Sequence, residues 1–295
     1  MITYWQAIIM GLVQGFTELF PVSSLGHSVL VPWVLGWHTL LADQSRSESF
    51  FLSFLVVLHV ATATALLIFY RSVWWRIIKG FFKSIKIRRI DSPDAHLAWL
   101  LLAATVPAGI IGLAFEHLLR TQFAKPLSAI IFLFINGCIL LIGDRHLKQT
   151  VRRAHYEQAT ISQNVSQKLT LRRAIIIGIA QIGALFAGIS RSGITMVSGL
   201  YSGLNHEDAA RFSFLLATPI IFGAGLVKLP DFFSNLDDGV RGQILLGGLI
   251  CGLAAYVAVR YLDKYFRNKT LRPFGIYCLG ISVAMLALGL ARGHF

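Results

Sequence analysis

Two short stretches of the sequence hold residues that could do chemistry, and each carries one charge inside an otherwise apolar region. Around Glu18 the sequence reads QGFTELFPVSSLGH, and around Arg191 it reads GISRSGIT. The first stretch offers a carboxylate, two serines and a histidine, which suit metal binding, nucleophilic attack and proton transfer. The second offers glycines, hydroxyls and a guanidinium, whose N–H groups can converge on phosphate oxygens at a helix start. The pair of stretches therefore predicts a site for a phosphorylated ligand.

The pattern around Glu18 predicts a helix that breaks and starts again. Gln14 and Glu18 lie four residues apart and share a helix face. Pro21 disfavours helix at the residue before it, so the chain can turn there. Ser23 or Ser24 can then cap a second helix, which places His27 on its first turn.

The composition argues against a soluble enzyme. Of the 295 residues, 55% are apolar and only 14% are charged, against roughly 25% charged in an ordinary soluble domain. The formal net charge of +13 could suggest a nucleic-acid binder, but such proteins gather Lys and Arg along a soluble groove or helix face. Here the charges interrupt apolar runs, so we expect a bilayer as the partner and no nucleic acid.

Six segments are apolar enough to cross a membrane, which takes about 17 to 25 helical residues. They are 50–70, 97–115, 126–143, 212–227, 244–259 and 273–291. Two further apolar segments, 5–37 and 174–203, are dense in Gly, Ser, Thr and Pro, so each is predicted to be a broken, re-entrant helix pair. Irregular backbone at membrane depth survives only when it is buried in protein or lines a cavity.

The basic residues predict the orientation. Nineteen of the 27 Lys and Arg fall in the stretches 71–89, 145–173 and 260–272, and cytoplasmic loops retain such residues. Both termini, and the site, are therefore expected on the outer side of the membrane.

The order of segments predicts an all-α polytopic membrane protein built as an inverted repeat. Residues 1–143 and 174–295 each hold one broken segment followed by three spans, and the basic cytoplasmic linker 144–173 joins them. Inverted repeats of this kind bring their broken segments together in the membrane interior. Glu18 and Arg191, one from each half, would meet there.

A charge at the bilayer centre costs about 2.5 to 3.5 kcal/mol on insertion scales and is by default a functional candidate. The plainer alternative is an ion pair between Glu18 and Arg191 that only holds the repeats together. The polar groups clustered around both residues favour a functional site.

These residues resemble the bacterial undecaprenyl pyrophosphate phosphatases of the bacitracin-resistance type. The first motif of that family has Glu or Gln, three residues, Glu, and then Pro-Val-Ser-Ser-x-Gly-His, which matches Gln14 to His27 here. The second, Pro-Gly-x-Ser-Arg-Ser-Gly-x-Thr, matches from Gly188 to Thr195, with Ala187 in place of the proline. Similarity also runs through 58–62 and 211–219.

The resemblance implies hydrolysis of a C55 polyprenyl pyrophosphate to the monophosphate in the bacterial inner membrane. This reaction recycles the lipid carrier for peptidoglycan synthesis and confers bacitracin resistance. The competing interpretation is an inverted-repeat transporter or flippase that carries the polyprenyl phosphate with the same residues. A second copy of the chain is a candidate partner.

The roles follow from the resemblance together with the chemistry of the residues. Glu18, Ser24, His27 and Arg191 are predicted to be catalytic, with the nucleophile left open between His27 and a Ser24 that uses His27 as its base. The phosphates are assigned to Arg191, Ser190, Ser192, Gly193, Thr195 and Ser23. A divalent cation, Mg²⁺ or Ca²⁺, is expected on Glu18 and Gln14, although Gln14 replaces the usual Glu and removes one charge. His59 is interpreted as an interhelical hydrogen-bonding residue, with a supporting role behind the catalytic residues as the alternative.

Overall fold

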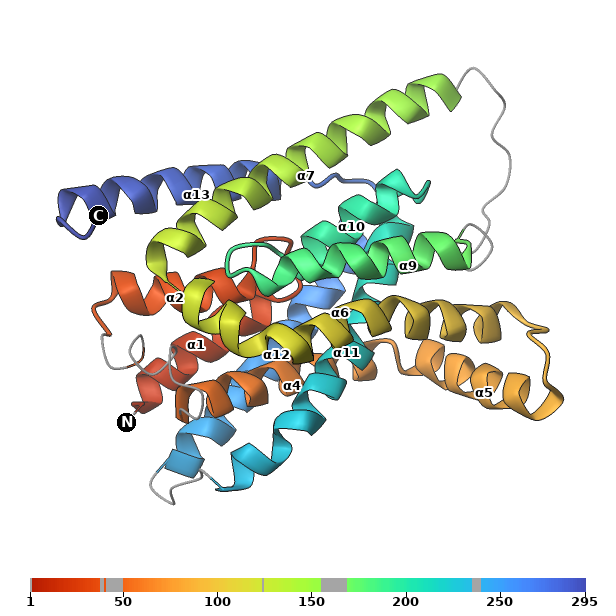
Figure 1. Ribbon diagram of the computed structural model, residues 1–295, viewed down its shortest axis with the longest axis horizontal. Coiled ribbons are helices and arrows are strands. Elements are labelled where there is room, and N and C mark those ends of the chain that lie inside the picture. The colour runs from red at the N-terminus through yellow and green to blue at the C-terminus, as the bar shows by residue number, and fades with distance from the viewer. Residues whose placement is uncertain (1, 38–39, 41–49, 124, 155–168, 235–239) are drawn as a thin grey trace.

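The computed structural model describes residues 2–37, 40, 50–123, 125–154, 169–234 and 240–295, and every regular element within these ranges is a helix. The first half contains α1 (Tyr4–Thr17), α2 (Ser24–Val34), α4 (Phe50–Phe69), α5 (Arg71–Ile87), α6 (Pro93–Phe123) and α7 (Pro126–Ala154). The second half contains α9 (Leu171–Ala180), the short 3₁₀ helix η1 (Gln181–Leu185), α10 (Arg191–Tyr201), α11 (His206–Ser234), α12 (Arg241–Tyr265) and α13 (Arg272–Ala291). Figure 1 shows their arrangement.

Five helices, α6, α7, α11, α12 and α13, are each long and apolar enough to cross a membrane. The helices α4 and α5 pass the same test only together, as a pair bent by 86°, so the described residues give six crossings if this pair is one span. Both predicted broken segments are broken helix pairs, α1 with α2 and α9 with α10. The basic stretch 71–89, which was expected to be a loop, is instead mostly the helix α5. It buries Ile77, Gly80 and Ser84 on one face, while Trp75 and Phe82 stay exposed together with the basic residues.

The outer faces of the spans are apolar. Along α12, Leu245, Leu249, Leu253 and Val257 recur at helical spacing and are 58 to 72% exposed. A face of this kind is unfavourable in water and suits lipid chains. The chain is therefore a multi-pass membrane protein.

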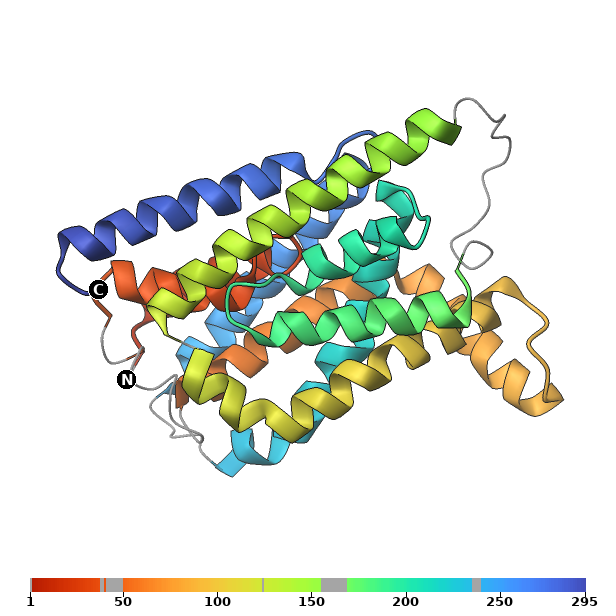
Figure 2. The same cartoon turned by 45° about the horizontal axis from the view of Figure 1, so that its top comes forward.

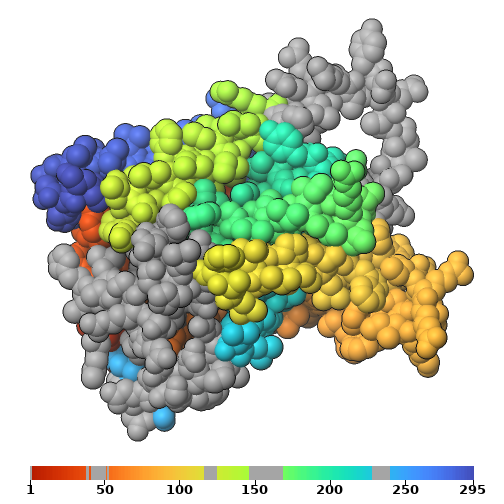
Figure 3. All heavy atoms as spheres, viewed as in Figure 1, coloured from red at the N-terminus to blue at the C-terminus, as the bar shows by residue number. Residues whose placement is uncertain are grey.

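The N- and C-termini lie at the same end of the molecule, and α5 extends from the opposite end (Figures 1 and 2). The space-filling view shows α7, α9 and α6 on one face (Figure 3). This arrangement agrees with the prediction that both termini lie on the same side of the membrane. Which side of the membrane that is stays a prediction.

The helix pairings cross between the two halves. α1 packs on α12 and α9 packs on α6, while α7 packs on α13 and α4 on α11. Reciprocal pairs of this kind are the arrangement that an inverted repeat would produce. The repeat itself stays a prediction. The predicted linker 144–173 begins as helix rather than as a loop, because α7 continues to Ala154. Residues 155–168 of the linker lie outside the described ranges.

Close approach of α1 to α12 depends on glycine. A Cβ built on Gly15 would lie 2.7 Å from the Ala254 Cβ and 3.0 Å from the Ala255 nitrogen. We expect Gly15→Ala to destabilise the protein by about 1 to 3 kcal/mol, because overpacking forces the helices apart. The measurement is the midpoint of thermal unfolding in detergent, followed by Trp fluorescence. Gly280→Ala is the matched control because a Cβ there meets nothing within 4 Å; equal midpoints for the two variants would contradict this packing.

Candidate active site

The first broken segment turns between Glu18 and Ser23. α1 ends at Thr17 with Glu18 as its C-cap, and Ser23 caps α2 by accepting a hydrogen bond from the Gly26 N–H at 3.1 Å. Ser23 has φ of 70°, a left-handed conformation that a residue with a side chain holds at a cost. The turn therefore presents Glu18 and the start of α2 to the interior of the protein.

The second broken segment is built in the same way at α10. Ser190 caps this helix by accepting from the Gly193 N–H at 3.1 Å, and Ile194 donates the first intrahelical bond to the Ser190 carbonyl at 2.9 Å. The N–H groups of Arg191 and Ser192 precede that bond, so they have no partner inside the helix. They are the backbone donors available to an anion at this helix start.

Hydrogen bonds join the tips of the two broken segments directly. The Gly188 N–H donates to the Ser23 hydroxyl at 3.2 Å, and the Ser192 hydroxyl donates to the Phe20 carbonyl at 3.3 Å. Gly188 has φ of +116°, and a Cβ on Gly26 would lie 3.0 Å from its Cα. Only glycine at both positions allows the backbones to approach this closely.

Asn136 on α7 ties both tips to a third helix. Its Nδ2 donates to the Pro21 carbonyl at 3.1 Å, and its Oδ1 accepts from the Ser190 N–H at 3.0 Å. Its side chain is fully buried. The sequence analysis did not single out Asn136, although a lone Asn inside the apolar segment 126–143 was a signal that could have identified it.

The two predicted intramembrane charges meet. Arg191 Nη2 lies 3.3 Å from Glu18 Oε1, with the side chains 14% and 6% exposed. Arg191 Nη1 also donates to the Ser213 carbonyl at 3.4 Å. Its Nε is buried and has no hydrogen-bond partner within the described part of the chain. The unused Nε–H can donate to a further oxygen while Nη2 stays beside Glu18.

Three side chains surround the second carboxylate oxygen of Glu18. Oε2 accepts from Gln14 Nε2 at 2.9 Å and from the Ser24 hydroxyl, and His59 Nε2 lies 3.4 Å away. Gln14 comes from α1, Ser24 from α2 and His59 from α4. The hydrogen bond polarises the Ser24 O–H and orients it, as a base does to a nucleophile.

The two ring nitrogens of His27 contact groups other than Ser24. Its Nδ1 lies 2.7 Å from the Ser23 carbonyl, which can only accept, so Nδ1 carries the proton. Its Nε2 lies 2.8 Å from the hydroxyl of Tyr277 on α13, and the two rings stack at 5.8 Å. In this structure the group that accepts the Ser24 hydrogen bond is Glu18, and the partner of His27 Nε2 is Tyr277, a residue that the sequence pattern did not single out.

The remaining predicted phosphate-binding hydroxyls are occupied locally. Ser190 and Ser192 share a hydrogen bond at 3.0 Å. Thr195 donates to the Arg191 carbonyl at 2.8 Å and shares a bond of 2.7 Å with Ser213. These groups shape the start of α10, and Gly193 contributes the capped N–H. They lie beside Arg191, so the residues that were predicted to bind the phosphates are close to one another.

His59 reaches the site rather than serving only between helices. Its Nδ1 donates to the Leu55 carbonyl at 2.8 Å, which directs Nε2 toward Glu18. Its side chain is 31% exposed, so it is the most open of the groups around Glu18 Oε2.

Oxygen atoms suited to a divalent cation occur beside Glu18. No cluster of three or more His, Cys, Asp or Glu able to hold a metal is found within the described ranges. However, Gln14 Oε1 is buried there without a hydrogen-bond partner. Mg²⁺ typically takes only one or two protein oxygens and completes its shell with water and substrate phosphates. Gln14 and Glu18 fit that donor set.

Comparison with known proteins gives a consistent result along nearly the whole chain. The model of the family described as bacitracin resistance protein BacA matches residues 7–284. The undecaprenyl-diphosphatase of Mycolicibacterium paratuberculosis is 50% identical over 97% of this chain and 98% of its own length. Undecaprenyl-diphosphatase 2 of Frankia alni is 48% identical, over 94% and 95% of the two chains. Undecaprenyl-diphosphatase 2 of Burkholderia ambifaria is 43% identical, over 96% and 95%.

Proposed function

The chain belongs to the bacitracin resistance protein BacA family, and from this premise we propose that it hydrolyses undecaprenyl pyrophosphate to undecaprenyl phosphate and phosphate. The reaction returns the lipid carrier to peptidoglycan synthesis. The observation that carries the assignment is the buried Glu18–Arg191 pair with the Ser24 hydroxyl on the same carboxylate. The transporter alternative finds no support, because these relatives are all named diphosphatases.

Arg191 is assigned to the pyrophosphate. Phosphoryl transfer depends mainly on positioning and on neutralising negative charge. The unpaired Nε of Arg191 and the first N–H groups of α10 can all donate to phosphate oxygens. A planar guanidinium does so with two parallel bonds, which also fixes the orientation of the terminal phosphate.

Ser24 is the better candidate for the nucleophile. Its oxygen attacks the terminal phosphorus, its proton passes to Glu18, and the bond from that phosphorus to the bridging oxygen breaks to release undecaprenyl phosphate. Water then cleaves the phosphoserine and frees inorganic phosphate. His27, one turn along α2 and hydrogen-bonded to Tyr277, is assigned to proton transfer in this second step.

A divalent cation is proposed beside these groups, held by Glu18 and by the unpartnered Gln14 Oε1. When bound, Mg²⁺ or Ca²⁺ would supply charge neutralisation of the pyrophosphate. The positive-inside pattern supports an outward-facing site in the bacterial inner membrane.

The decisive experiment is phosphate release from C55 pyrophosphate by the purified protein in detergent, with and without EDTA. Phosphate release that EDTA abolishes and added Mg²⁺ or Ca²⁺ restores is the expected result. Ser24→Ala serves as the inactive control. Absence of release by the wild type across a range of metal conditions would contradict the proposal.

His59 offers a separate test of the site. We expect His59→Ala to lower kcat about tenfold with little change in KM, because a donor facing Glu18 is lost while the phosphate contacts remain. His59→Gln should recover most of kcat, since its amide N–H can reach the same oxygen. Comparable kcat values for the two variants would assign His59 to packing alone.

A further inference from the structure

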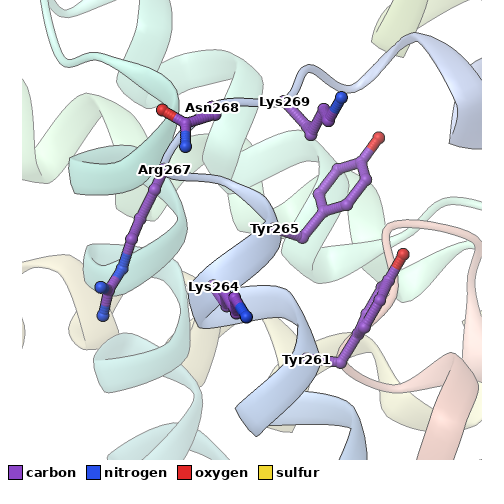
Figure 4. A pocket seen from close by; sticks show the side chains of 6 residues that line it. All are labelled: Tyr261, Lys264, Tyr265, Arg267, Asn268 and Lys269. Atoms are coloured by element: carbon purple, nitrogen blue, oxygen red, sulfur yellow. The ribbon is translucent and has the colours of Figure 1, made fainter.

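A second cluster of polar residues lies outside the site, where α12 ends and the connection to α13 begins. It surrounds a cavity of about 540 Å³ that is open to the surface and is lined by Tyr261, Lys264, Tyr265, Arg267, Asn268 and Lys269. Figure 4 shows these side chains, with the two tyrosine rings side by side along α12. None of these residues has a role in the proposed hydrolysis.

The basic side chains around the cavity are only partly paired with acidic residues within the described part of the chain. Arg267 is held by Asp263 at 3.2 Å and faces Glu207 at 3.9 Å, and its guanidinium points away from the tyrosines (Figure 4). The ammonium groups of Lys264 and Lys269 have no acidic partner within the described part of the chain. Two free cations beside an aromatic wall favour an anionic ligand.

The walls of the cavity are fixed before any ligand arrives. The Tyr261 ring stacks on Phe20 with centroids 6.0 Å apart and an interplanar angle of 6°. The Tyr265 hydroxyl donates to the Thr270 carbonyl at 3.2 Å, and its ring packs edge-on against Phe274. Rings held in this way lose little entropy when a ligand binds.

The position of the cavity relative to the membrane indicates the class of ligand. The candidate span on α12 ends at Tyr265, so the cavity lies at the membrane boundary, where lipid headgroups are found. Val257, one turn before Tyr261, is 58% exposed and continues the apolar outer face of α12 toward the lipid chains. Basic pockets at the ends of membrane helices bind anionic headgroups, and tyrosines are enriched at this level.

We propose that this cavity binds the headgroup of an anionic phospholipid. The phosphodiester lies between Lys264 and Lys269, the Tyr261 ring flanks it, and the acyl chains follow the exposed face of α12. The proposal is independent of the hydrolytic activity, because it concerns a different part of the molecule and a ligand that is not cleaved.

The test is native mass spectrometry of the full-length protein in detergent, titrated with phosphatidylglycerol or with phosphatidylcholine. The wild type is expected to retain one phosphatidylglycerol in preference to phosphatidylcholine. K264Q/K269Q should weaken this retention at least about tenfold. K79Q/K86Q is the matched control, because it removes two exposed lysines from α5, in another of the basic stretches, and should retain the lipid as the wild type does.

Two results would overturn the proposal. One is equal retention of phosphatidylglycerol by K264Q/K269Q and K79Q/K86Q, with matching thermal unfolding midpoints that show both variants to be folded. The other is displacement of the lipid by millimolar inorganic phosphate, which would identify a site for free phosphate rather than for a headgroup.

Discussion

Replacing Arg191 by lysine is expected to lower kcat for phosphate release about a hundredfold. Lysine keeps the charge, but its ammonium is a point charge and cannot place two parallel N–H bonds on phosphate oxygens. Removal of one preorganised donor from a transition state typically costs 10²- to 10³-fold. The measurement is steady-state release of phosphate from C55 pyrophosphate in detergent.

The control for this variant is Arg211→Lys. Arg211 lies on α11 and pairs with Glu207 at 3.0 Å and with Asp263 at 3.4 Å, outside the proposed site. Its substitution should change kcat less than about twofold, since exposed ion pairs contribute little. If Arg191→Lys also turned over near the wild-type rate, the role of Arg191 would be its ion pair with Glu18 and not the binding of phosphate.

The two central charges could be predicted from the sequence because a charge inside an apolar segment has a high free-energy cost and is therefore rare. A carboxylate and a guanidinium inside apolar segments are tolerated only with partners, and in this chain the only candidates were Glu18 and Arg191. The turns could be predicted in the same way, because Pro21 disfavours helix at the residue before it, Ser23 can cap a helix and Gly188 can adopt a positive φ. These properties depend on residue type and near neighbours, so no three-dimensional information was needed.

The contributions of Asn136, His59 and Tyr277 could not be predicted in the same way. Each lies within a largely apolar span, and its partner lies between 41 and 250 positions away along the chain. Which face of a span meets the site depends on how the helices pack, and a uniformly apolar span carries no periodic signal of that face.

The pairing of Ser24 with His27 shows a different limit. The two residues are three apart on α2, and residues at this spacing are neighbours on a helix surface. The structure shows other partners for both residues: the Glu18 carboxylate for Ser24, and the Ser23 carbonyl with Tyr277 for His27. Local spacing allows a contact, and competition among all available partners decides it.

Glu18→Gln is expected to reduce kcat at least about a thousandfold, the second of the two largest effects. The substitution is nearly isosteric, so Gln14, Ser24 and His59 still face an oxygen or an amide. However, an amide cannot take the Ser24 proton, and it leaves the buried charge of Arg191 without its counter-ion. A fall in kcat without loss of the folded protein, judged by its unfolding midpoint, is the expected outcome.

Gln14→Glu provides the opposite change four residues away on the same helix face. It replaces the amide that donates to Glu18 Oε2 by a second carboxylate, so the two acids repel unless a cation lies between them. We expect substantial activity with a steeper dependence on Mg²⁺ or Ca²⁺ than in the wild type. The double variant Gln14→Glu/Glu18→Gln keeps the total charge but removes the carboxylate that contacts Ser24. It should be as inactive as Glu18→Gln, and its recovery would show that charge in the site matters more than the Ser24 contact.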